Sequence, residues 1–163
     1  MAKSSPRDGS SDPLTTAAVA LGSNVGDRSA HLDFAVARLA PLLEDLKVSG
    51  YYETEPVGVV GDQSPFLNAA AVGKTALTAP ELLDALMAIE RERGRERPHP
   101  NAPRTLDLDL ILFGDAVIAE PSLVVPHPRF RERRFVLEPL AEIAPDLRDP
   151  VTGLSVAGML SSL

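Results

Sequence analysis

The chain contains no cysteine and no tryptophan, and aromatic residues make up only 4% of its 163 residues. The lack of cysteine excludes disulfides, thiolate metal ligands and cysteine nucleophiles. No apolar run is long enough to span a bilayer, and residues 1–13 (MAKSSPRDGSSDP) lack the apolar stretch of a secretory signal. These absences predict a cytoplasmic protein with no membrane partner. They also make any aromatic residue beside a polar motif a candidate for ligand binding.

The length and composition predict one globular domain behind a polar tail. A chain of this length is typical of a single domain, and 44% hydrophobic with 24% charged residues is typical of soluble proteins. Residues 1–13 have almost nothing to bury, so we expect them to form a disordered tail. The single domain is then expected to cover residues 14–163.

The formal net charge of −7 argues against nucleic acid as a partner. The basic residues are nevertheless clustered. Nine of the 16 lie in two short stretches, and these nine are Arg91, Arg93, Arg95, Arg97, Arg104, Arg129, Arg131, Arg133 and Arg134. Two arginine clusters in an acidic chain favour a small polyanionic ligand, although solvated arginines paired with neighbouring glutamates would give the same pattern.

Apolar periodicity predicts alternating strands and helices. We expect strands at residues 15–21, 46–52, 66–75 and 106–113, and loops at residues 22–26, 53–65 and 95–104. A helix capped by Asp27 should follow the first strand, and Pro80 and Gly94 should begin and end a second helix. Two further helical pieces are expected near residues 131–143 and 152–163.

This order, β-α-β-β-α-β followed by a helical tail, predicts an α+β fold of the ferredoxin-like type. In such a fold an antiparallel sheet carries the two core helices on one face. The C-terminal helices would be additions to that core.

The sharpest chemical signal is the segment 104–109 (RTLDLD). Side chains alternate between the two faces of a strand, which would place Asp107 and Asp109 on one face, roughly 7 Å apart at the backbone. The opposite face would carry Leu106, Leu108, Leu110 and Leu112. Paired carboxylates can bind one metal ion or bridge two, and Mg²⁺ favours carboxylate, water and phosphate oxygens.

An outer strand with a solvated face is the alternative interpretation of this pattern. The residues that would continue the carboxylate face, Ile111 and Phe113, are apolar. Two acids followed by apolar groups indicate the mouth of a pocket more than an open surface. From the motif alone, a metal site and a solvated strand both remain open.

Segment 103–110 (PRTLDLDL) resembles the signature of the 6-hydroxymethyl-7,8-dihydropterin pyrophosphokinases of folate biosynthesis. The similarity extends from the first expected strand to the end of the helix near Arg131. Further motifs agree in order and spacing, namely Gly22-Ser23-Asn24, Tyr52–Thr54, residues 66–70 (FLNAA), Val125-Pro126-His127 and Arg133-Arg134-Phe135. The resemblance implies transfer of pyrophosphate from ATP to the hydroxymethyl group of the pterin, with release of AMP.

The resemblance also implies which residues bind metal and nucleotide. Asp107 and Asp109 would hold two Mg²⁺ ions that bridge the ATP phosphates and the acceptor oxygen. The implied catalytic residues are Arg95, Arg104, Asp107 and Asp109. The implied contacts to the co-substrate ATP are Arg95, Arg97, Arg104, Leu110, His127 and Arg133. Arginine suits phosphate because its planar fork donates two parallel hydrogen bonds, whereas His127 alone, between two prolines, could equally be a structural turn residue.

The implied pterin site pairs two aromatic rings with a polar edge. Phe66 and Phe135 would stack on the flat heterocycle, while Asn68, Thr54 and the backbone at Val57 would read its hydrogen-bonding edge. Either phenylalanine alone would be interpreted as a core residue. The resemblance implies only small-molecule partners, ATP and the pterin, and we expect a monomer.

The chain departs from the family pattern at three positions in or near the expected loops. Asn101 stands where members carry Trp, Pro128 follows the histidine where Tyr is common, and Glu55 replaces an expected Pro. These changes fall on the loop expected to close over ATP and on the adenine contacts.

Two other functions are compatible with parts of the sequence. Paired acids also serve in hydrolases, but a hydrolase would leave the nine clustered arginines unexplained. A non-catalytic module that binds pterin or nucleotide would not need both Asp107 and Asp109. Detection of AMP after incubation with ATP, Mg²⁺ and the pterin would separate the three functions.

Overall fold

The computed structural model describes residues 13–54, 65–94 and 105–163. Its main sheet has five antiparallel strands in the order β2-β4-β1-β5, with β3 also pairing with β4. The bounds of these strands are β1 Thr15–Ser23, β2 Glu44–Val48, β3 Tyr52–Thr54, β4 Phe66–Thr75 and β5 Asp107–Phe113. The central strands are therefore β1 and β4, and β5 lies at one edge.

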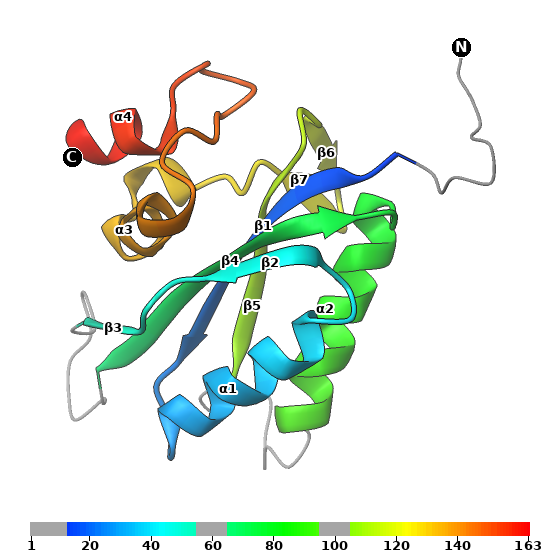
Figure 1. The fold of residues 1–163 in the computed structure, drawn as a ribbon, viewed down its shortest axis with the longest axis vertical. Coiled ribbons are helices and arrows are strands. Elements are labelled where there is room, and N and C mark those ends of the chain that lie inside the picture. The colour runs from blue at the N-terminus through cyan, green and yellow to red at the C-terminus, as the bar shows by residue number, and fades with distance from the viewer. Residues whose placement is uncertain (1–12, 55–64, 95–104) are drawn as a thin grey trace.

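Two helices cover one face of this sheet, α1 (Arg28–Leu39) and α2 (Ala79–Gly94) (Figure 1). Asp27 caps α1 as expected, because its carboxylate accepts a hydrogen bond of 3.1 Å from the Ala30 N–H. Thr78 and Glu81 form a reciprocal capping box at the start of α2. The buried residues of the two helices are Leu32, Ala35 and Leu39 in α1 and Ala79, Leu82, Leu86 and Ile89 in α2.

The opposite face is covered at one end by α3 (Arg134–Ile143) and α4 (Val156–Ser161) (Figure 1). A short 3₁₀ turn, η1 (Phe130–Glu132), precedes α3. Phe130, Leu137 and Leu140 are fully buried there against Ala18, Ala70 and Ile111 of the sheet, and they form a second apolar core. The other end of this face, where β4 begins and β5 begins, carries the residues singled out by the sequence.

The β1–β5 pairing contains a bulge that changes which residues share a face. Ala18 pairs with Leu112 and Val19 pairs with Leu110, which leaves Ile111 as the extra residue. The extra residue reverses the alternation beyond it. Leu112 therefore joins Ile111 in the α3-side core, and Phe113 packs in the α1–α2 core. The prediction that Leu112 lies with the other leucines and Phe113 with the aspartates was wrong.

Several other helix and strand boundaries differ from the expected ones by a few residues. The expected strand 46–52 is two strands, because Ser49 turns its side chain to the backbone N–H of Ala70 between β2 and β3. Gly22 and Ser23 extend β1 instead of forming a turn. The helix expected from residue 131 begins at Arg134 after η1, and the last helix covers Val156–Ser161 only.

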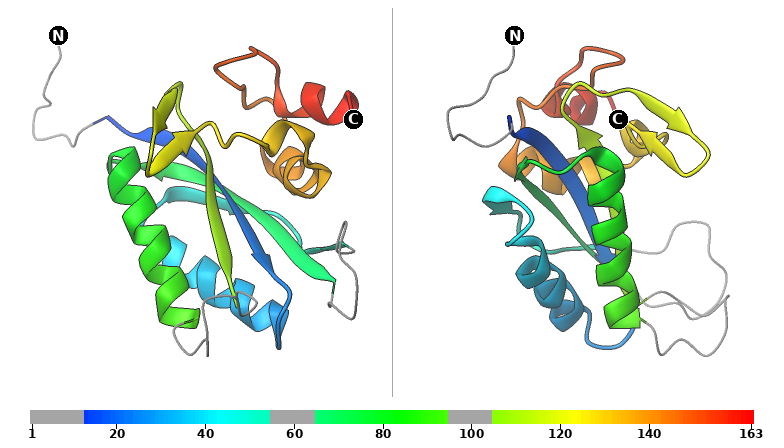
Figure 2. Two further views of the ribbon diagram at one scale, coloured as in Figure 1. Left: turned by 180° about the vertical axis from the view of Figure 1, so that it is seen from behind. Right: turned by 90° about the vertical axis from the view of Figure 1, so that its right-hand side faces the viewer.

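A small hairpin, β6 (Ile118–Glu120) with β7 (Leu123–Val125), was not expected from the sequence. It projects from the main sheet (Figure 2), and β7 leads directly to the segment that contains His127. The expected βαββαβ order with C-terminal helices is confirmed. Across residues 13–54, 65–94 and 105–163, no helix is long and apolar enough to cross a membrane. Residues 1–12 of the expected tail (1–13), residues 55–64 of the expected loop 53–65 and the whole expected loop 95–104 lie outside the described residues.

Candidate active site

The floor of the candidate site is a row of residues across three strands. Gly22 of β1 pairs with Asn68 of β4 on one side and with Asp107 of β5 on the other. Directly paired residues point to the same face of a sheet, so the amide and the carboxylate lie at the two ends of a row whose middle has no side chain. A Cβ added at Gly22 would lie 3.3 Å from the Asn68 Oδ1. Glycine therefore keeps the space between the two polar residues open.

The next row has the same character. Ala20 of β1 pairs with Ala70 of β4 and with Asp109 of β5. The two aspartates thus share the face that α3 covers further along, as the alternation predicted, with small residues beside them. Asp107 is half-buried and Asp109 is exposed.

The polar edge of the site is fixed by a hydrogen bond between two adjacent strands. The Asn68 Nδ2 donates to the Thr54 Oγ1 over 2.7 Å. Thr54 pairs with Phe66 across the β3–β4 ladder, which places all three side chains on one face. The structure therefore brings together three residues that the sequence assigned to the pterin: Asn68 buried, and Thr54 and Phe66 half-buried.

The acidic edge is held by α2 from the other side. The backbone N–H of Leu108, between the two aspartates, donates to the Glu90 Oε2 of α2 over 2.7 Å. Leu106, Leu108 and Leu110 are buried in the α1–α2 core. The leucines anchor β5 on one face, and this anchoring fixes the direction of the carboxylates on the other.

His127 lies beside the acidic edge. Its backbone N–H donates to the Ile111 carbonyl over 3.0 Å, and its Nδ1 accepts a 3.2 Å hydrogen bond from the Arg129 N–H. Burial is the largest influence on the pKa of the imidazole and lowers it below its ordinary value; the Asp109 carboxylate opposes this, while Arg133 and Arg129 lower it further. The ring is therefore neutral at pH 7, and with Nδ1 as acceptor its proton resides on Nε2.

The start of α3 presents an exposed aromatic ring. Phe135 is 36% exposed, whereas the next two residues, Val136 and Leu137, are buried in the core. The Arg133 guanidinium lies over the Phe135 ring, 5.5 Å from its centroid. Arg133 is the N-cap residue of α3 and has an extended backbone. The pair therefore lies at the N-terminal end of α3, which is the end that follows His127 in the sequence.

The remaining predicted residues divide into two groups. The side chain of Leu110 is buried in the α1–α2 core, on the face opposite Asp109, so only its backbone could reach a ligand in the site. Arg95, Arg97, Arg104 and Val57 lie outside the described residues. Sequence reasoning missed Gly22 and Ala20 as floor residues, because only the register with β4 and β5 shows their position.

Metal binding cannot be assigned to a preformed protein cluster. Over the ranges 13–54, 65–94 and 105–163, no group of three or more His, Asp or Glu side chains is arranged to hold a metal ion. Asp107 and Asp109 supply two carboxylates on one face, so an ion there would need further ligands from water or phosphate.

Solved structures establish the fold class first. The chain superposes on Plasmodium falciparum HPPK-DHPS with a TM-score of 0.75 and 16% identity, over 94% of this chain and 46% of that one. A crystal structure of HPPK-DHPS in complex with substrates gives a TM-score of 0.73 at 13% identity. At such identity these structures establish the fold alone, the ferredoxin-like α+β fold, and this chain spans about half their length.

Sequence comparison then defines the family. Residues 18–145 match the model of the 7,8-dihydro-6-hydroxymethylpterin-pyrophosphokinase (HPPK) family, and the chain belongs to this family. It is 49% identical over 136 residues to the 2-amino-4-hydroxy-6-hydroxymethyldihydropteridine pyrophosphokinase of Bacillus subtilis, covering 82% of this chain and 81% of that one. It is 46% identical over 134 residues to the Pseudomonas aeruginosa protein of that name, covering 81% and 82%. It is 40% identical over 146 residues to the folic acid synthesis protein fol1 of Pneumocystis carinii, but covers only 20% of that longer chain.

Proposed function

We propose that the floor defined by Gly22 and Ala20 belongs to the active site at which this pyrophosphokinase brings its two substrates together. The chain transfers pyrophosphate from ATP to the hydroxymethyl group of 6-hydroxymethyl-7,8-dihydropterin, a step of folate biosynthesis. The observation that carries the site assignment is the register Asn68–Gly22–Asp107. It sets the polar edge and the acidic edge two strand spacings apart, roughly 10 Å, over an open floor.

The pterin is proposed to lie at the polar edge. Asn68 offers an acceptor and two donors, one of which is already directed to Thr54. Phe66 from the sheet and Phe135 from α3 supply the stacking faces. The exposure of Phe135 supports this role, because a large ring left outside the core at a helix start is available to a flat ligand.

The phosphates of ATP are proposed to lie between the acidic edge and the start of α3. The Arg133 guanidinium would bind phosphate oxygens, and the neutral His127 would donate one hydrogen bond from Nε2. Arg95, Arg97 and Arg104 are proposed to complete the phosphate site on the strength of the family resemblance. Any role of Leu110 would run through its backbone.

Two Mg²⁺ ions fit the donor set of the acidic edge. Asp107 and Asp109 share one face, Gly22 and Ala20 beside them leave space, and carboxylates are ligands that Mg²⁺ accepts together with water and phosphate. When bound, such ions neutralise charge on the entering and leaving oxygens of the transfer. We propose that Asp107 and Asp109 hold them, while the arginines and His127 align the phosphate chain.

The carboxylate-pair hydrolase and the non-catalytic binding module are disfavoured by the family match. A direct test of the activity is the release of AMP and pterin diphosphate from ATP, Mg²⁺ and the pterin. A chain that consumed ATP to give ADP, or that bound both ligands without release of AMP, would contradict the assignment.

The position of the site is tested by filling its floor. Gly22→Val places a branched side chain between Asn68 and Asp107, and valine is favourable in a strand whose backbone does not require glycine here. We expect loss of most pterin binding in a protein that remains folded by circular dichroism. Pterin affinity equal to that of the unaltered chain would place the ligand elsewhere.

Monomeric state and cytoplasmic location are further proposals. The location is supported by a chain without cysteine, which suits a reducing compartment. The monomer stays a prediction. Sedimentation velocity with and without both substrates tests the monomer.

A further inference from the structure

The C-terminal end of α3 is tied to the edge of the sheet by one carboxylate. The Glu142 side chain accepts a hydrogen bond of 2.6 Å from the Tyr52 hydroxyl and bonds of 3.1 and 3.2 Å from the Gly50 N–H. Gly50 lies in the segment that joins β2 to β3, and Tyr52 is the first residue of β3. We call these three residues the α3 tether.

The tether joins the two elements that carry the walls of the proposed pterin site. Tyr52 begins β3, and two residues later on the same strand face stands Thr54, which binds Asn68. Tyr52 itself pairs with Asn68 across the ladder. Glu142 lies on α3, seven residues after Phe135, which corresponds to roughly two helical turns.

The β3 strand is three residues long and, among the described residues, pairs with β4 alone, so few backbone hydrogen bonds hold its position. Its Glu53 side chain also accepts a hydrogen bond of 2.6 Å from Arg28 at the start of α1, but that contact does not join β3 to α3. By contrast, α3 is anchored by Val136, Leu137 and Leu140 in the second core. A hydrogen-bonded carboxylate on the anchored helix can therefore set the position of the short strand.

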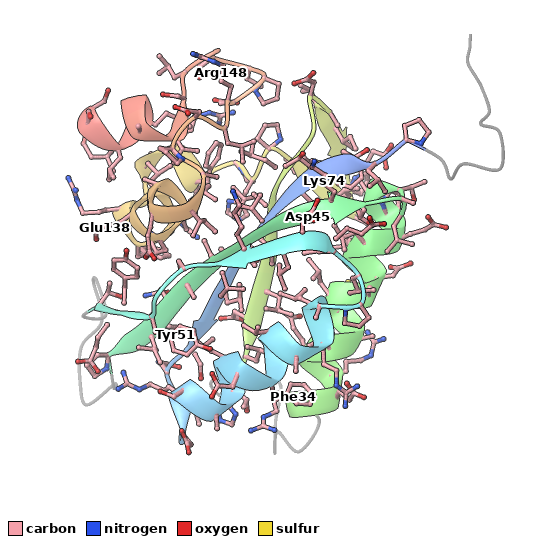
Figure 3. The ribbon with its side chains drawn as sticks, in the orientation of Figure 1. Phe34, Asp45, Tyr51, Lys74, Glu138 and Arg148 are labelled. Atoms are coloured by element: carbon pink, nitrogen blue, oxygen red, sulfur yellow. The ribbon has the colours of Figure 1, made fainter. Side chains whose placement is uncertain are left out.

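A matched contact exists on the opposite face of the sheet. Tyr51, one residue earlier, points to the α1 side (Figure 3), and its hydroxyl donates to the Asp33 Oδ1 over 2.5 Å. The hydrogen bond from Tyr52 to Glu142, with burial second, raises the pKa of Tyr52 to about 12, and burial followed by the bond to Asp33 raises that of Tyr51 to about 12. Two adjacent tyrosines thus make comparable bonds, one toward the proposed site and one away from it.

We propose that Tyr52 and Glu142 are positioning residues for the pterin, which hold the Thr54–Asn68 edge at a fixed distance from Phe135 on α3. The proposal rests on the proposed function of the site. Neither residue needs to touch a substrate: each acts through the placement of the residues that stack on the pterin and read its edge. The expected consequence is a change in pterin affinity that ATP affinity does not share.

The experiment compares Tyr52→Phe with Tyr51→Phe, since each removes one hydroxyl that donates to a carboxylate. We expect Tyr52→Phe to raise the Kd of the pterin about three- to tenfold, with less than about twofold change for an ATP analogue. The loss is smaller than the full contribution of one hydrogen bond to a charged acceptor, because Tyr52 acts on the ligand only through its neighbours. Tyr51→Phe should lower the thermal unfolding midpoint as much as Tyr52→Phe does, but it should leave the Kd of the pterin unchanged. Isothermal titration of both ligands measures all four constants.

Variants of the acceptor complete the test. Glu142→Gln keeps one acceptor oxygen and should give a Kd between those of the unaltered chain and Glu142→Ala. Equal losses for pterin and ATP, or equal effects of Tyr51→Phe and Tyr52→Phe, would show that the tether only supports the fold. Unchanged pterin affinity in Tyr52→Phe would overturn the proposal, whether or not turnover changes. Absence of AMP release from the unaltered chain would instead contradict the proposed function.

Discussion

The two faces of the main sheet are built from the same strands but carry different residues. On β1, the α1–α2 face carries Val19 and Leu21, whereas the opposite face carries Ala20 and Gly22, which alternate with them. The first face is filled mainly with apolar side chains, with the buried Ser23 at the end of β1. Among the described residues, the second is filled where α3 and α4 lie, and beyond them it carries small residues flanked by polar ones.

This difference shows how one strand can serve stability and chemistry at once. Alternation along β5 buries Leu106, Leu108 and Leu110, and the same alternation directs Asp107 and Asp109 to the other face. The better the leucines are packed, the more narrowly the direction of the carboxylates is set. Substitutions on the carboxylate face should therefore lower turnover, whereas substitutions on the leucine face should lower stability.

The largest expected effect is on the carboxylate face. Asp107→Asn and Asp109→Asn should each lower kcat by about 100-fold or more while the protein stays folded, because an amide nearly matches the shape of the carboxylate but binds Mg²⁺ far less well. Each factor of ten corresponds to about 1.4 kcal/mol of transition-state stabilisation. The measurement is AMP release at saturating ATP and pterin.

Asp115→Asn is the control for this pair, since Asp115 is an exposed aspartate in the turn just after β5. It should retain full turnover. Near-normal kcat in a folded Asp107→Asn or Asp109→Asn protein would show that the residue is not an essential metal ligand.

The next effect is on the packed face and should appear as stability. Leu86 of α2 is fully buried in the α1–α2 core. Leu86→Ala should lower the free energy of unfolding by about 2–5 kcal/mol, the usual cost of a cavity left by a buried leucine. Urea unfolding measures this loss, and kcat per folded molecule should stay within about twofold, because the change costs packing free energy and not transition-state binding.

Loss of kcat without loss of stability in Leu86→Ala would contradict the claim that the α1–α2 face serves stability and the opposite face serves catalysis. The exposed neighbour Met87 offers a matched control. Met87→Ala should change the unfolding free energy by less than about 0.5 kcal/mol, the range of ordinary surface substitutions.

The sequence predicted the elements whose patterns are long and local. The strand at residues 66–75 has the expected bounds, and the helix from Ala79 to Gly94 begins one residue before the expected Pro80 and ends where expected. Each has clear periodicity and is bounded by proline, glycine or capping residues. The β6–β7 hairpin was missed because strands of three residues contain too little periodicity. The bulge at Ile111 was missed because it exists only in the register with β1.

The candidate site likewise contains features that the sequence predicts and features that it does not. Residues within a motif, such as Asp107 with Asp109, share a face because of local alternation, which sequence alone predicts. Contacts between distant segments could not be predicted. Asn68 with Thr54 and Glu142 with Tyr52 depend on strand pairing and helix docking, which no local pattern specifies.

A smaller and pH-dependent effect is expected in the segment that joins α3 to α4. Asp149 is fully buried and receives hydrogen bonds from Arg131, the Val151 N–H and Thr152. Burial alone would raise the pKa of Asp149, but these bonds and the Arg131 charge outweigh it and lower the pKa to about 2. An unfolded aspartate titrates near pH 3.9, so the folded state stabilises the ionised carboxylate more than the unfolded state does.

The stabilisation from Asp149 is therefore fully present above about pH 4 and is lost as the pH falls toward 2. We expect Asp149→Asn to lower the free energy of unfolding by on the order of 2 kcal/mol at pH 7, and the difference from the unaltered chain to shrink between pH 4 and pH 2. Urea titrations across this range check the sign. A difference that stays constant with pH would show that Asp149 contributes through packing alone.

The smallest expected effect separates two phenylalanines that make similar contacts on the two faces. Phe135 lies under Arg133 beside the proposed pterin site, and Phe34 of α1 lies under Arg38 and Arg93 on the other side, 4.8 Å from each. Phe135→Leu keeps an apolar side chain but removes the ring, so stacking worth about 0.5–1.5 kcal/mol should be lost and the Kd of the pterin should rise about two- to tenfold. Phe66→Leu should act in the same direction, whereas Phe34→Leu (Figure 3) should leave pterin affinity unchanged. Titration with pterin and with an ATP analogue decides the case: equal weakening of both ligands by Phe135→Leu, or weakening of the pterin by Phe34→Leu, would mean that the rings support the fold and that the polar residues alone select the pterin.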